Sequence, residues 1–91
     1  MIYLCEIEDV FDLHGRGCIV VPGIPHSLPP GARVYPGTAL LIVTPTGEEL
    51  RTTISAVEMI NRGKPLDHAP FCVPRGIKKQ QLAIGSKVYA L

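Results

Sequence analysis

The stretch TALLIVTPTGEELRTTI, residues 38–54, contains two apolar runs separated by a short polar segment. The polar segment includes Pro45 and Gly47, two residue types that favour tight turns. The flanking runs are rich in β-branched residues, which favour β-strands. The stretch therefore predicts a β-hairpin, with one strand over 38–43 and a turn at 44–48.

The second half of this hairpin, within residues 50–60, is compatible with two patterns. Leu50, Ile54 and Val57 match one face of a helix, whereas Leu50, Thr52, Ile54 and Ala56 match one face of a strand. The two adjacent threonines and the preceding turn favour the strand.

The rest of the chain is divided by nine glycines and nine prolines, which leave room for a helix only in residues 1–14 and 48–62. A tight turn is predicted at 14–17, a surface loop at 22–30 and a single helical turn within 75–81. Further short strands are predicted at 2–7, 18–21, 32–35, 71–73 and 87–91. Closely spaced short strands predict an all-β protein, a small closed β-barrel in which residues 1–91 form a single domain.

The charges are distributed unevenly, although their sum is +1. Residues 1–12 carry four acids and no base, whereas residues 61–91 carry six bases and one acid, Asp67. A basic region can bind phosphate groups, and Arg75, Lys78 and Lys79 form its densest cluster. The alternative is that the fold brings the acidic and basic ends together to neutralise each other.

The length excludes several classes of protein, because 91 residues cannot hold a GTP- or ATP-hydrolysing domain. The beginning of the chain has no basic segment typical of a secretory signal, and no apolar run is long enough to span a membrane. Three widely separated cysteines fit the reducing cytoplasm. We therefore expect a cytoplasmic protein with no contact with a membrane.

Catalytic and metal-binding chemistry find little support in the sequence. The acids of residues 6–12 could form a catalytic carboxylate pair, but the pattern favours charges that are solvated at strand ends. The three histidines and three cysteines lack the paired spacing of a zinc site and offer no recognisable Cys–His nucleophile. We expect no enzyme activity, cofactor or metal.

The order of several short segments resembles the second domain of elongation factor Tu, a small β-barrel of translational GTPases. The segments are IEDVF at 7–11, GRG at 15–17, Val57-Glu58-Met59, RGIK at 75–78, and Gly85 with Val88. The resemblance covers nearly the whole chain. It implies a β-barrel that, beside a GTPase domain, helps hold the aminoacylated 3′ end of transfer RNA.

The resemblance also implies roles for individual residues. Glu58 corresponds to the glutamate that contacts the terminal adenosine, and Glu8, Asp9 and Phe11 to the segment beside the aminoacyl pocket. Arg16 corresponds to the arginine of the turn that follows. A carboxylate can accept hydrogen bonds from ribose hydroxyls, and an aromatic ring can cover a base. Without the resemblance, these residues would be interpreted as core, turn and surface residues.

The sequence departs from the family at the amino-acid pocket, where the altered positions are Val21, Ala69, Phe71 and Val73. Ala69 replaces an asparagine and cannot supply an amide to grip an amino acid. Phe71 replaces a glycine and could fill the pocket.

Two functions follow as hypotheses. The chain is a non-catalytic, RNA-binding module of protein biosynthesis that contacts the tRNA 3′ end or the ribosome; or it is a stand-alone protein-interaction barrel that docks onto a translation factor. In neither case would it bind GTP by itself. Whether the chain is an excised domain or a complete protein stays open.

Overall fold

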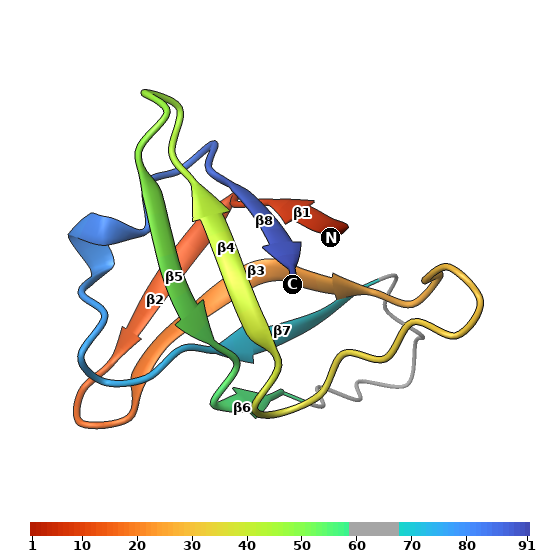
Figure 1. Cartoon of the computed structure of the whole chain (residues 1–91). Helices are drawn as coiled ribbons and strands as arrows, with labels where there is room; N and C mark the ends of the chain where they lie inside the picture. The colour runs from red at the N-terminus through yellow and green to blue at the C-terminus, as the bar shows by residue number, and fades with distance from the viewer. Residues whose placement is uncertain (59–67) are drawn as a thin grey trace.

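A computed structural model describes residues 1–58 and 68–91 and is all-β, with two antiparallel sheets (Figure 1). The first sheet has the strand order β1-β8-β4-β5, and the second has the order β2-β3-β7-β6. The strands are β1 (Ile2–Glu6), β2 (Asp9–Leu13), β3 (Gly17–Pro25), β4 (Ala39–Val43), β5 (Glu49–Thr53), β6 (Ala56–Val57), β7 (His68–Cys72) and β8 (Lys87–Ala90). The all-β prediction is confirmed.

The predicted hairpin of residues 38–54 forms β4 and β5. Val43 pairs with Glu49, and the Thr44 amide donates to the Glu48 carbonyl at 2.8 Å to close the turn. Leu40 and Ile42 alternate with the outward Leu41 and Val43, and both are completely buried. The strand interpretation of residues 50–60 holds for 49–53 and 56–57.

The two sheets share two corners, at which the chain passes from one sheet to the other. At the first corner, the Ile7 amide donates to Ser86 at 2.7 Å and the next amide, of Glu8, donates to Val21 at 2.9 Å. At the second corner, the Ile54 amide donates to Thr38 at 3.0 Å and the Ser55 amide donates to Cys72 at 2.8 Å. At both corners backbone hydrogen bonds therefore continue from one sheet into the next.

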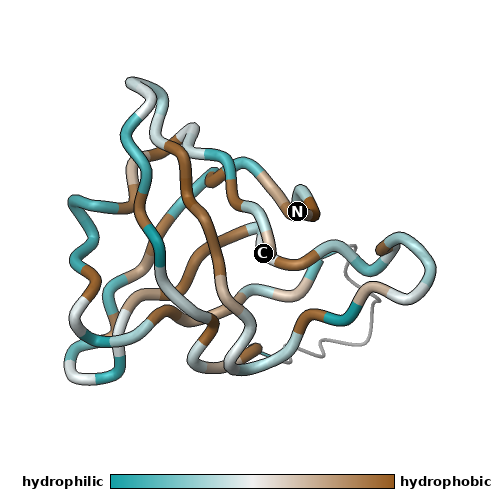
Figure 2. Tube along the Cα trace, in the orientation of Figure 1, coloured by the Kyte–Doolittle hydropathy of each residue, from teal (hydrophilic) through white to brown (hydrophobic). Residues whose placement is uncertain are grey.

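The core lies between the two sheets and takes residues from both. Figure 2 shows hydrophobic residues along β3 and β4 and hydrophilic residues at the tip of the β4–β5 hairpin. Phe71 of β7 is completely buried, as are Val20 of β3 and Val88 of β8. Burial of these apolar side chains is the main stabilising term in a domain of this kind.

The connection between β7 and β8 completes the core without a strand. Successive turns, closed by the Ile77 amide on Pro74 and the Leu82 amide on Lys79, run through the short 3₁₀ helix η1 (Lys79–Gln81). Leu82 is buried and Ile77 packs against the core. The predicted helical turn within 75–81 is confirmed. No helix in residues 1–58 and 68–91 is long and apolar enough to cross a membrane.

Two predictions for residues 22–35 were wrong. The predicted strand at 32–35 lies in the irregular connection 26–38, where one turn is closed by Ala32 on Pro29 and another by Thr38 on Tyr35. The predicted loop at 22–30 begins only after Pro25, because β3 continues through Pro22. The β3–β7 pairing is irregular between Val20 and Ile24, and prolines are tolerated where a strand leaves the regular ladder.

The acidic segment near the start of the chain also differs from expectation. The strand predicted at 2–7 ends at Glu6, and a separate strand, β2, begins at Asp9, so Glu6 and Glu8 do not lie on one strand. β2 was not predicted, because its single buried residue, Val10, stands between exposed ones. Met59 of the Val57–Met59 segment and the charged Arg62, Lys64 and Asp67 lie outside the described residues.

Candidate functional site

The turn between β2 and β3 is the structural base of the candidate site. Leu13 pairs with Gly17, and the Arg16 amide donates to Leu13 at 2.7 Å. Gly15 and Gly17 have φ angles of 83° and 93°, which other residues rarely adopt. A Cβ atom on Gly17 would overlap the Val73 carbonyl oxygen. Glycine therefore lets this turn lie directly against the chain that leaves β7.

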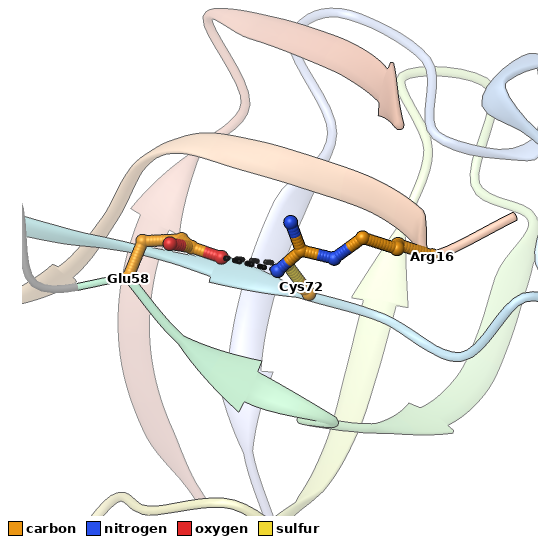
Figure 3. Close-up of polar contacts among 3 residues, drawn as sticks. All are labelled: Arg16, Glu58 and Cys72. Atoms are coloured by element: carbon orange, nitrogen blue, oxygen red, sulfur yellow. Dashed lines mark hydrogen bonds and ion pairs between the residues drawn. The ribbon is translucent and has the colours of Figure 1, made fainter. Parts of the chain in front are cut away.

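From this turn, Arg16 reaches across the outer side of the second sheet to Glu58, which follows β6 (Figure 3). Its Nη2 lies 3.8 Å from Glu58 Oε1, and the Cys72 thiol donates to the same oxygen at 3.4 Å. The side chain of Arg16 is 71% exposed and that of Glu58 is 29% exposed. Both groups are therefore accessible to a ligand. An exposed ion pair of this kind adds at most ~1 kcal/mol of stability.

An apolar row crosses the same outer face. Phe11 pairs with Ile19, Ile19 with Cys72, and Cys72 with Ala56. Paired residues of antiparallel strands project to the same face of the sheet. The apolar character of Phe11 alone would predict a core residue. Its side chain is 51% exposed, so Phe11 does not belong to the core. The structure thus places Phe11, Arg16 and Glu58 on one face.

Glu8 and Asp9 are farther from this group. Glu8 lies at the first corner, and Asp9 begins β2 at the end opposite the β2–β3 turn. The Asp9 carboxylate accepts a hydrogen bond from the Val10 amide at 2.8 Å, which fits its interpretation as a local backbone-binding residue. Two strands, β3 and β7, lie between β2, which carries both Asp9 and Phe11, and the strand before Glu58, so about 14 Å separates these strands.

The three basic residues predicted to contact phosphate come together at one hollow. Arg75, Lys78 and Lys79 line it with Asp12 and His14 of the facing strand and turn. His14 was not predicted to lie with these three basic residues. Its position next to the Gly15-Arg16-Gly17 turn was visible, but the pairing of that turn with the β7–β8 connection was not.

Asp12 at this hollow also bears on the charge distribution. It brings an acid of the first twelve residues beside bases of the last third, and Glu6 likewise pairs with Lys87 across β1 and β8. The acidic and basic regions therefore meet at two places. Three bases against one acid still leave the hollow positively charged.

Among the altered pocket positions, Phe71 does not lie where it could fill a pocket. Phe71 and Val73 are completely buried in the core, so they point away from the outer face on which Arg16 and Glu58 meet. Phe71 therefore does not fill a hollow on that face. Val21 and Ala69 are half-buried, and Ala69 pairs with Ile24 of β3.

The Cys72 thiol at this site has a pKa above the ordinary value. Burial raises the pKa of Cys72, and its hydrogen bond to the Glu58 carboxylate raises the pKa further because that bond requires the protonated thiol. A nucleophilic cysteine needs the opposite shift. In residues 1–58 and 68–91, no group of three or more histidines, cysteines or acids is arranged to hold a metal ion.

Comparisons with family models and with solved structures assign no function to the chain. No family model matches the chain, and no solved structure matches it significantly. The fold and the side-chain geometry therefore carry the functional argument.

Proposed function

We propose that this chain is a non-catalytic binding module that forms a small closed β-barrel similar to the second domain of elongation factor Tu, and that it binds the 3′ end of an RNA. The observation that carries the proposal is the contact of Arg16 with Glu58 on the outer face of β2, β3, β7 and β6, the face on which Phe11 is also exposed. Glu58 lies 42 residues after Arg16 in the sequence.

The two corners support closure into a barrel. If β1 and β2 are taken as one bent strand, and β5 and β6 as another, neighbouring strands pair all the way around. The order is then β1/β2, β8, β4, β5/β6, β7, β3 and again β1/β2. Such a barrel leaves no open sheet edge.

The side chains suit a terminal nucleoside. The Glu58 carboxylate can accept hydrogen bonds from ribose hydroxyls, which distinguish RNA from DNA. Phe11, Ile19 and Ala56 provide an apolar surface on which a base can lie. Because alanine occupies position 69, the module would recognise the nucleoside without gripping an attached amino acid.

The test measures binding of a short RNA ending in CCA, and of the same RNA with a 2′,3′-dideoxy terminal ribose. We expect the dideoxy end to bind wild-type protein about tenfold more weakly, because hydrogen bonds to a charged group are lost. The variant Glu58→Gln should bind the two ends almost equally. Glu49→Gln, which alters an exposed glutamate of the first sheet, should behave as wild type. Equal binding of both ends by wild-type protein would overturn the proposal.

A second candidate function, protein interaction, is favoured by the outer face of the first sheet. Tyr3 is 51% exposed and packs edge-to-face on Tyr89 at a centroid distance of 5.7 Å. Met1 and Leu91, at the neighbouring chain ends, are also exposed. Binding through this face would be nearly insensitive to salt and lost in Tyr3→Ala, whereas binding to RNA phosphates would weaken steeply with salt.

A further inference from the structure

The strongest remaining feature is the positively charged hollow between the β2–β3 turn and the β7–β8 connection. It has a volume of about 310 Å³, at the small end of the range for small-molecule sites. Arg75, Lys78 and Lys79 supply three positive charges, and Asp12 supplies one negative charge. His14 adds a ring whose nitrogens can donate hydrogen bonds. The composition favours an anion.

The backbone fixes the positions of these cations. Gly17 allows the β2–β3 turn to approach Val73, so that the chain continues into Arg75 beside the turn. Farther along, Ile77 and Leu82 pack inward, and Lys78 and Lys79 between them remain exposed. The Lys78 amide donates to the Gln81 side chain at 2.8 Å and holds this turn.

A buried thiol also lines this hollow. Cys18 lines it, and its thiol lies 3.9 Å from the Ile77 carbonyl oxygen. Burial raises the pKa of Cys18, Asp12 raises it further, and the positive charges of Lys79 and Lys78 lower it.

A second hollow adjoins the first. It has a volume of about 430 Å³ and is lined by Arg16, Ala56 and Cys72, the surroundings of Glu58. Gly15 and Arg75 line both hollows, so the two meet at these residues. A ligand that occupies the second hollow can extend past Arg75 into the first.

We propose that the hollow lined by His14, Arg75, Lys78 and Lys79 is a phosphate-binding site, and that on RNA it holds the phosphodiester that precedes the terminal nucleoside. The second part rests on the proposed function, whereas the phosphate site itself does not. The planar Arg75 guanidinium can bind two phosphate oxygens at once, and the lysine ammonium groups can approach the others.

The first experiment titrates ¹⁵N-labelled protein with inorganic phosphate at constant ionic strength, with chloride as the reference anion. We expect amide shifts at His14, Gly15 and Gly17 and at Arg75, Lys78 and Lys79. The double variant Lys78→Gln/Lys79→Gln should bind phosphate about tenfold more weakly. The matched control Arg51→Gln/Lys87→Gln removes two exposed charges from the first sheet and should bind as wild type.

The second experiment measures the affinity for the CCA-ending RNA as a function of salt. Each lost phosphate contact should reduce the magnitude of the slope of log K against log salt by about 0.7. We expect Lys78→Gln, which alters a residue of the first hollow alone, to reduce this slope by about that amount, while it retains the preference for a ribose end that Glu58 confers. Arg51→Gln should leave the slope unchanged.

The outcomes separate the two proposals. Phosphate shifts absent from the hollow, with RNA still discriminated through Glu58, would overturn the phosphate site and leave the proposed function intact. Phosphate binding at the hollow without any preference for the ribose end would support the site and overturn the proposed function. Equal weakening by the hollow variant and its matched control would reduce the effect to net charge and would overturn the site.

Discussion

Gly15 and Gly17 share one turn and similar backbone angles but differ in their surroundings. The space around Gly15 is open, whereas a side chain on Gly17 would meet the Val73 carbonyl. The same residue type thus serves two purposes. Gly15 provides a turn conformation, and Gly17 additionally permits the contact that brings the basic connection to the site.

We expect Gly15→Ala to lower the free energy of unfolding by about 1–2 kcal/mol, the cost of positive φ for a residue with a Cβ atom. Gly17→Ala should cost clearly more, because it adds an overlap with backbone that cannot rotate away. Urea unfolding of both variants measures the difference. Equal losses of stability would show that the Gly17 contact with Val73 is not needed.

The elements of this fold depend on the two corners as much as on the strands. At each corner, successive amides donate to carbonyls of different sheets, as Ile7 and Glu8 do at the first and Ile54 and Ser55 at the second. A pair of stacked sheets without these bonds would have open edges at β1, β5, β2 and β6, and such edges promote aggregation.

We predict that the amides of Ile7, Glu8, Ile54 and Ser55 exchange with solvent as slowly as those of the central strand β4. If the corners are part of a closed barrel, these amides open only when the whole domain unfolds. Amide hydrogen exchange followed by NMR measures this, with the exposed loop residues Arg33 and Thr46 as fast-exchanging references. Corner amides that exchange as fast as these references would argue for two separate sheets.

At the scale of the whole molecule, three buried thiols link stability to pH. Burial is the largest cause that raises the pKa of Cys5, Cys18 and Cys72. In the unfolded chain, a cysteine thiol has a pKa of about 8.5. Above that pH the unfolded chain binds fewer protons than the folded protein, and stability therefore falls as the pH rises.

We expect the free energy of unfolding to decrease from about pH 7.5 to about pH 9.5, as measured by urea unfolding under reducing conditions. The variant Cys72→Ala removes one of the three thiols and the hydrogen bond to Glu58. It should be less stable near neutral pH but should lose less stability at alkaline pH. An identical pH dependence in both proteins would contradict a role of the Cys72 thiol.

Local sequence patterns were sufficient for several elements. The β4–β5 hairpin, the strands near both ends, the β2–β3 turn and the helical turn near Lys79 each depend on neighbouring residues and were predicted. The sequence pattern failed for two segments, residues 32–35 and β2. Residues 32–35 have the composition of a strand, but turns closed within 29–38 hold them in a loop. β2 contains two aspartates, which are unfavourable in strands, and it forms a strand because it pairs with β3.

The sequence by itself determined the all-β class and the chemical groups available: carboxylates, a basic cluster and two phenylalanines. Only the tertiary structure decided which of these groups meet. Arg16 and Glu58 are 42 residues apart, and their contact requires β3 and β7 to lie between them in a particular register. Phe11 and Phe71 are both apolar, yet register places one outside and the other in the core. Register arises from long-range pairing, which no local pattern specifies.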